Sequence, residues 1–140
     1  NIDLLKKTDD SININLDYSK KDDLILNCDY EQISRAIFNL IKNSIESIQE
    51  KAQNIGNFDK KINIAIERIN YYIAINIFDN GIGFTKNTKK ELTKPYYTTK
   101  KKGSGLGLSI VNKIINDHNG NIEFNSDIIG TNIIINLPIK

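Results

Sequence analysis

The chain has 140 residues, 39% of them hydrophobic and 26% charged, which is the composition of a single globular domain with a real core. Its net charge of +2 is too small to indicate a nucleic-acid-binding protein. Cys28 is the only cysteine, which excludes an internal disulfide and fits a reducing compartment. The sequence contains no signal peptide and no apolar run near the roughly 18 residues that span a bilayer, so we expect a cytoplasmic domain.

The first residues of the chain are expected to lie outside the domain itself. Residues 1–11 are expected to be the tail of a preceding linker or helix, and residues 12–140 the domain. Residues 12–17 alternate between apolar and polar side chains, the pattern of a half-buried strand. A turn then leads to a second, short strand that we expect from Leu24 to Cys28.

The clearest helix begins at Asp29, which forms a pattern resembling a capping box with Gln32. Apolar residues recur at helical spacing as far as Ile48 and predict a buried face. Polar residues fall on the opposite face at i, i+4 and i+7: Asn39, Asn43 and Glu46. Residues 49–58 are expected to form a loop.

The rest of the chain predicts one more helix and four strands. The strands are expected at 61–69, 72–78, 121–125 and 131–137, with a turn at 68–71 and the helix over about 105–118. Residues 79–104 have no clean periodicity and are expected to be a long loop. The order predicts an α/β (α+β) two-layer sandwich, a mixed, mostly antiparallel sheet packed on one face by about three helices.

The most informative segment runs from Lys94 to Leu108 and combines lysines and hydroxyl side chains with three alternate glycines. Glycine lets the backbone approach phosphate oxygens closely, and the positive end of the following helix lies next to it. A dinucleotide fingerprint would need glycine in place of Leu108, and a Walker A loop needs a glycine followed by lysine, which the chain lacks. A flexible surface loop that ends in a helix start remains the alternative.

Four segments, in this order, resemble the ATP-binding domain of sensor histidine kinases, within the superfamily shared with DNA gyrase B, Hsp90 and MutL. They are Asn39–Asn43 on the helix, Asp79–Phe84 after a strand, the basic glycine loop, and Gly130–Thr131 before the last strand. The resemblance covers about residues 12 to 138 and implies a Bergerat-type fold with a long ATP lid loop. The wording of residues 95–100, Pro-Tyr-Tyr-Thr-Thr-Lys, is most similar to kinases of the nitrogen-regulation type.

The resemblance implies that ATP and Mg²⁺ are the cofactors. In the family pattern the side-chain oxygen of Asn43 binds Mg²⁺, and Asn39 lies one turn earlier on the phosphate side. One amide oxygen suffices, because Mg²⁺ keeps several water and phosphate ligands. The alternative is that both asparagines belong to a solvated polar face.

The same resemblance assigns the adenine site to the end of a strand. Asp79 accepts the exocyclic amine of adenine, Gly81 and Gly83 let the base lie against the backbone, and Thr131 reaches the base through a water shared with Asp79. Two alternatives remain open: Asn80-Gly81 is also a favourable hairpin turn, and Thr131 could be an ordinary strand residue.

Phosphate binding and transfer are expected to depend on the lid and on the helix that follows it. Lys100 or Lys101 is the candidate for the γ-phosphate, and with Asn39 these residues are the catalytic candidates. The further residues expected to bind the nucleotide in this region are Thr99, Gly103, Ser104, Gly105, Leu106, Gly107 and Leu108. A solvated lysine loop is the alternative.

The resemblance implies a protein-histidine kinase domain that binds Mg·ATP and donates the γ-phosphate to a histidine in two-component signal transduction. Its expected partners are the dimerisation and histidine phosphotransfer helices of its own parent protein and a response regulator, with no nucleic acid. We expect the isolated domain to be monomeric. A parent kinase anchored in the inner membrane fits the same pattern.

Two residues distinguish the histidine kinase interpretation from related functions. In gyrase-like ATPases a glutamate occupies the position of Asn39 and activates water; an amide cannot do this, so efficient hydrolysis is not expected. His118, the only histidine, stands at a helix end and is expected to cap the last carbonyl groups, not to accept phosphate. A gyrase- or Hsp90-type ATPase and a non-catalytic nucleotide-sensing module remain the alternative functions.

Overall fold

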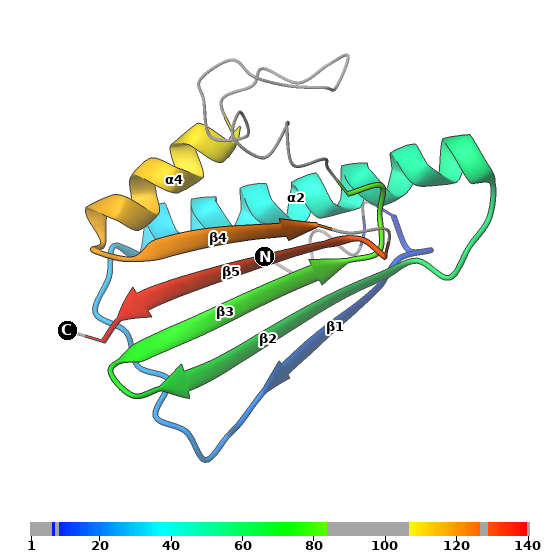
Figure 1. The fold of residues 1–140 in the computed structure, drawn as a ribbon. Helices are drawn as coiled ribbons and strands as arrows, with labels where there is room; N and C mark the ends of the chain where they lie inside the picture. Colours follow the sequence, from blue (N-terminus) through cyan, green and yellow to red (C-terminus); the bar gives the residue numbers. More distant parts are fainter. Residues whose placement is uncertain (1–6, 8, 84–106, 127–128, 140) are drawn as a thin grey trace.

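The computed structural model describes residues 7, 9–83, 107–126 and 129–139, which form one sheet covered on one face by helices (Figure 1). The sheet contains five strands: β1 (Asn13–Tyr18), β2 (Lys61–Ile69), β3 (Tyr72–Asp79), β4 (Asn121–Ser126) and β5 (Thr131–Pro138). Their spatial order is β1-β2-β3-β5-β4, with β1 parallel to β2 and every other pair antiparallel. The predicted mixed, mostly antiparallel sheet is confirmed.

The predicted strand from Leu24 to Cys28 is wrong, because this segment forms no ladder with any described strand. Leu26 packs against the core, whereas the side chain of Ile25 is 73% exposed. A short apolar run is ambiguous by periodicity, and here it is an irregular connection between β1 and the first helix.

Helix α2 (Tyr30–Ile55) begins where the sequence predicted but ends later. Asp29 is its N-cap, and the Asp29 carboxylate accepts the Gln32 N–H at 3.1 Å. The predicted loop at 49–58 is wrong over its first seven residues. The apolar period stops at Ile48, yet Gln, Glu, Lys and Ala continue the helix until Gly56, which has a φ of 82°.

Helix α4 (Gly107–Asp117) packs beside α2 on the same face of the sheet. The part of the chain that the structure describes contains these two helices, fewer than the three that we predicted. In α4 the predicted cap is confirmed: His118 Nδ1 lies 2.7 Å from the Ile114 carbonyl oxygen. Asn119 follows with a φ of 58° and ends the helix.

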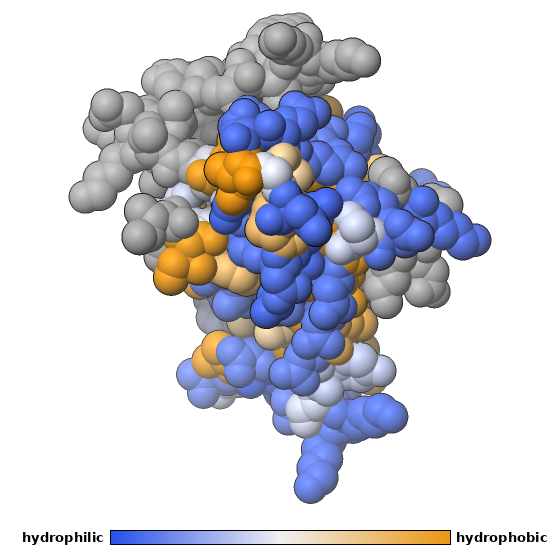
Figure 2. All heavy atoms as spheres, turned by 90° about the vertical axis from the view of Figure 1, so that its right-hand side faces the viewer, coloured by the Kyte–Doolittle hydropathy of each residue, from blue (hydrophilic) through white to orange (hydrophobic). Residues whose placement is uncertain are grey.

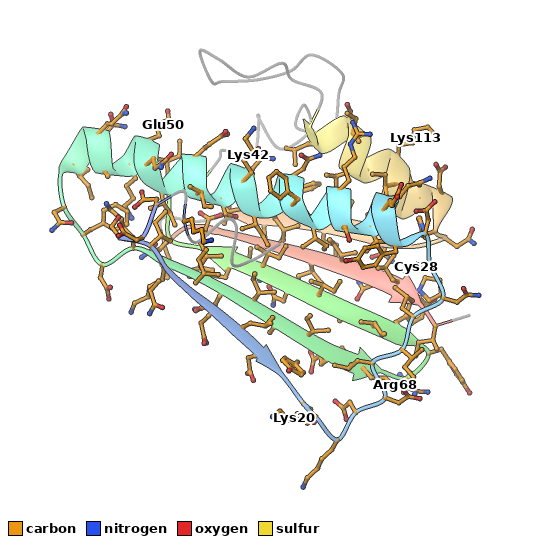
Figure 3. All side chains as sticks on the ribbon, turned by 180° about the vertical axis from the view of Figure 1, so that it is seen from behind. Lys20, Cys28, Lys42, Glu50, Arg68 and Lys113 are labelled. Atoms are coloured by element: carbon orange, nitrogen blue, oxygen red, sulfur yellow. The ribbon has the colours of Figure 1, made fainter. Side chains whose placement is uncertain are left out.

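The core lies between the helices and the sheet and consists mainly of isoleucine. Alternate residues of the strands point into it, among them Ile62, Ile77 and Ile135, and they meet Leu40 and Ile48 of α2. Charged side chains such as Lys42 and Lys113 lie on the helix surfaces away from the sheet (Figure 3). This one-sided burial leaves the polar stripe of α2 outside the core.

Candidate functional site

The candidate site lies at the end of the sheet where β3 ends. Asp79 is the last residue of β3 and only 2% exposed, and its backbone is in register with Ile62 of β2 and Thr131 of β5. Because β3 is paired on both sides up to Asp79, no strand can return beside it. The Asn80-Gly81 hairpin is therefore excluded, and the chain leaves the sheet here.

The carboxylate of Asp79 is oriented by the loop that follows it. Its Oδ1 accepts the Gly81 N–H at 2.9 Å, a bond that is itself buried. A buried carboxylate that accepts a backbone N–H keeps a defined direction, as base recognition requires.

Gly81 packs directly on helix α2. A Cβ added to Gly81 would lie 2.2 Å from Ser47 Oγ and 2.7 Å from the Ser47 carbonyl carbon, so only glycine fits. The next residue is bonded to the same serine, since the Ile82 N–H donates to Ser47 Oγ at 3.1 Å. Gly83 is half-buried and has a φ of 71°, a backbone conformation that also favours glycine.

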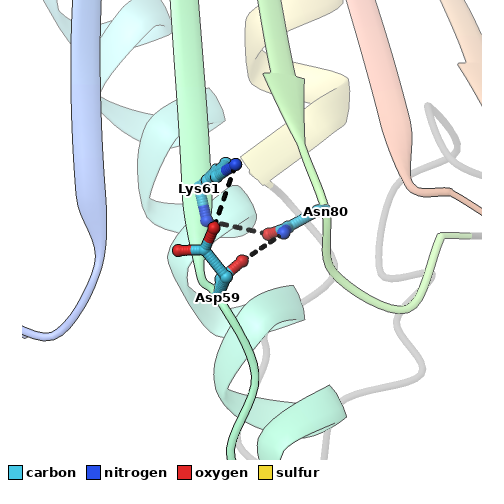
Figure 4. A network of polar contacts seen from close by, with 3 residues as sticks. All are labelled: Asp59, Lys61 and Asn80. Atoms are coloured by element: carbon cyan, nitrogen blue, oxygen red, sulfur yellow. Dashed lines mark hydrogen bonds and ion pairs between the residues drawn. The ribbon is translucent and has the colours of Figure 1, made fainter.

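Asn80 has a structural role that the sequence did not reveal. Its side chain accepts the Lys61 N–H at 2.8 Å and donates to the Asp59 carbonyl at 2.6 Å (Figure 4). Lys61 Nζ lies 3.0 Å from the Asp59 carboxylate in the same network. The amide of Asn80 thus joins the end of β3 to the start of β2.

Asn39 and Asn43 both lie on α2, the helix on which the sequence predicted them, and both are half-buried. Ser47, which contacts Gly81, follows Asn43 by one turn, which corresponds to about 6 Å along the helix axis. The amide stripe and the loop after Asp79 therefore meet on one side of α2. Thr131 is 7% exposed and stands opposite Asp79 on the neighbouring strand.

Gly107 and Leu108 are the first residues of α4, and both are half-buried. The backbone N–H groups of a first helical turn have no partner within the helix and can bind an anion. Seven predicted site residues lie outside the described residues: Thr99, Lys100, Lys101, Gly103, Ser104, Gly105 and Leu106.

The donor atoms near this site suit a metal that is bound together with phosphate. Among the described residues no group of three or more His, Cys, Asp or Glu side chains could hold a metal ion. Asn43 offers a hard amide oxygen, and Mg²⁺ takes its other ligands from water and phosphate. The predicted Mg²⁺ ligand is therefore compatible with the residues present.

A hollow lined by Asp10 to Ile14 lies at the same end of the sheet but two strands away, at the start of β1. None of the predicted site residues lines it. This end of the molecule faces the viewer in Figure 2 and is mainly hydrophilic with scattered hydrophobic side chains. The hollow does not contribute to the candidate site.

Comparison with known proteins gives the family. The model of the histidine kinase-, DNA gyrase B- and HSP90-like ATPases matches residues 28–140. This chain belongs to that family. The match includes all the residues that we assigned to the nucleotide site, and the resemblance to sensor histidine kinases inferred from the sequence is confirmed.

Relatives of the domain include a protein named as a kinase and one named as a nitrogen regulation protein. Over 117 residues it is 39% identical to sporulation kinase B of Bacillus subtilis, a match that covers 83% of this chain and 26% of that protein. It is 36% identical to nitrogen regulation protein NtrY of Azorhizobium caulinodans over 112 residues, 80% of this chain and 14% of that protein. The chain thus spans about a quarter or less of these relatives.

Solved structures agree with the fold. The catalytic domain of histidine kinase ThkA in a nucleotide-free form has a TM-score of 0.81 and 27% identity, and the match covers 99% of this chain and 86% of that one. ThkA in complex with response regulator TrrA has a TM-score of 0.77 and 25% identity, over 99% and 38% of the two chains. Within the described residues, neither helix is apolar enough over sufficient length to span a bilayer.

Proposed function

We propose that this domain binds Mg·ATP between α2 and the end of β3 and donates the γ-phosphate to a histidine outside the chain. The observation that supports this most directly is the contact of the loop after Asp79 with α2, one turn from Asn43. It brings the loop that follows the buried Asp79 carboxylate against the helix that carries Asn39 and Asn43.

In this proposal each candidate site residue within the described part of the chain has a defined task. The carboxylate of Asp79 accepts the exocyclic amine of adenine and thereby selects adenine over guanine, which carries a carbonyl there. The amide oxygen of Asn43 holds Mg²⁺, which offsets the negative charge of the phosphates. The backbone N–H groups of Gly107 and Leu108 bind phosphate oxygens at the positive end of α4.

Transfer breaks the bond between the γ-phosphorus and the β–γ bridging oxygen and forms a bond to an imidazole nitrogen, with ADP as the leaving group. Such a reaction depends mainly on positioning and on cations, a task for Lys100 or Lys101. Asn39 cannot accept a proton from water, which favours transfer to histidine over hydrolysis.

The acceptor histidine is proposed to lie in the dimerisation helices of the parent protein. His118 suits a structural role, because its Nδ1 contacts the Ile114 carbonyl and its Nε2 accepts the Asp29 N–H at 3.1 Å. A response regulator is the proposed downstream partner, by analogy with the complex that ThkA forms. We propose a cytoplasmic location for the domain, whether or not its parent is anchored in the inner membrane.

The test is a titration of the domain with a non-hydrolysable ATP analogue, with and without Mg²⁺, by calorimetry. We expect Mg²⁺-dependent binding that is weakened by Asn43→Ala and by Asp79→Asn, with Asp79→Asn reducing the preference for ATP over GTP. An absence of Mg²⁺-dependent binding at millimolar concentration would refute the proposal. Transfer to an added acceptor helix pair distinguishes a kinase from a non-catalytic nucleotide-sensing module.

A further inference from the structure

Helix α2 holds the loop after Asp79 at two successive turns beyond Asn43. At the first turn, Ser47 Oγ accepts the Ile82 N–H at 3.1 Å and the Ser47 main chain contacts Gly81. At the second turn, Lys51 Nζ donates to the Asn80 carbonyl at 3.0 Å, and the same ammonium group lies 4.7 Å from the centre of the Phe58 ring.

These bonds restrain all three residues that follow Asp79. Lys51 restrains Asn80, Ser47 restrains Ile82, and Gly81 between them donates to the carboxylate of Asp79. The direction of that carboxylate therefore depends on contacts with α2. The side chains of Ser47 and Lys51 are polar groups on the helix that also carries Asn43. They therefore connect the adenine end of the proposed site to its metal end.

We infer that Ser47 and Lys51 are positioning residues that hold the loop of residues 80–82 at a fixed position along α2. They thereby orient the carboxylate of Asp79 toward the adenine amine. This inference rests on the proposed function. Neither side chain is required to touch the nucleotide. Without the Ser47 bond the loop must be ordered when ATP binds, and that cost lowers affinity and base selectivity together.

The chain supplies a matched control for this idea. Ser44 lies on the same helix, and its hydroxyl is buried without a hydrogen-bond partner among the described residues. Ser44→Ala and Ser47→Ala both remove one hydroxyl from α2, but only Ser47→Ala releases the loop.

The experiment compares wild type, Ser47→Ala and Ser44→Ala by calorimetric titration with Mg·ATP and with purine riboside triphosphate, which lacks the exocyclic amine. Loss of one hydrogen bond predicts a roughly two- to tenfold weaker affinity of Ser47→Ala for ATP. The preference for ATP over the purine analogue should fall as well. Amide hydrogen exchange at Ile82 should accelerate in this variant without nucleotide, while Ser44→Ala keeps the wild-type affinity and nucleotide preference and shows no acceleration at Ile82.

Lys51→Met is the second variant, because it keeps the aliphatic stem but releases Asn80 at its carbonyl. We expect it to reduce the preference for ATP in the same direction. An unchanged preference in both variants would overturn the inference, as would an equal loss of affinity for both nucleotides. If the wild-type domain itself fails to bind Mg·ATP, the proposed function is refuted. If the wild type binds Mg·ATP but both variants keep its full preference for ATP, only the positioning role of Ser47 and Lys51 is refuted.

Discussion

The close contact between Gly81 and α2 makes a sharp prediction for Gly81→Ala. The new Cβ would lie 2.7 Å from the carbonyl carbon and 2.8 Å from the Cβ of Ser47, besides 2.2 Å from its Oγ. Carbon atoms in contact stand about 3.5 Å or more apart, so the loop or the helix must shift by roughly 0.8 Å. No side-chain rotation can relieve a contact with the main chain.

Overpacking of this kind costs about 1–3 kcal/mol. For a domain of this size that corresponds to a fall in melting temperature of roughly 3 to 12 °C. If the loop moves instead, Asp79 loses the bond from the Gly81 N–H and the affinity for ATP drops. Calorimetric melting and an ATP-analogue titration on the same sample measure both effects.

Two further variants sharpen this test. Gly107→Ala is the stability control, because a Cβ at Gly107 meets no atom of the described residues within 4 Å, and the melting temperature of this variant should not fall. Adding Ser47→Ala to Gly81→Ala removes the Oγ contact but not the two carbon contacts, so it should not restore wild-type behaviour. Wild-type stability and affinity in Gly81→Ala would refute the close packing of the loop on the helix.

Three other predictions concern stability. Ser44→Ala removes a buried hydroxyl without a described partner and should raise the free energy of unfolding in urea by about 1 kcal/mol; a decrease would show that the hydroxyl is satisfied. His118→Ala removes the bonds to Ile114 and Asp29 and should lower that free energy by about 1–2 kcal/mol, and an unchanged value would contradict the role of His118 as a link between α4 and α2. The Ser11 hydroxyl and the Gln49 amide, both bonded to Asp9, hold the pKa of its carboxyl below the ordinary value despite an opposing contribution from burial. Ionised Asp9 therefore stabilises the folded domain above about pH 4, and this stabilisation is lost as pH falls through the lowered pKa. Urea unfolding of Asp9→Asn at pH 7 and pH 3 should therefore show less acid destabilisation than wild type, and an equal acid effect in both proteins would count against the depressed pKa.

Local pattern was a good guide wherever one face of an element is buried. The period of two in β2 and β3, and the N-cap at Asp29, were read correctly because the same side chains that define the pattern form the core. The residue pattern failed where a helix continues beyond its buried part. The last turns of α2 are helical by propensity and by the cap at Gly56, although the apolar period ends at Ile48.

The candidate site shows the same division. Asn43, Asp79 and the glycines were proposed as site residues from the sequence, because their types and spacing resemble the family pattern. Ser47 and Lys51 carried no such signal, since a serine and a lysine on a helix are ordinary surface choices. Their partners are backbone groups at Ile82 and Asn80, more than twenty-five residues away in the sequence.

The amino-acid order alone determined the family, the alternation of the strands and the types of group available for nucleotide and metal. Only the folded chain decided which of these groups meet. Strand pairing places Asp79 beside Thr131, and the packing of Gly81 on Ser47 brings the end of β3 against α2. Such contacts depend on the register between distant segments and on backbone groups that every residue carries, so residue type alone does not specify them.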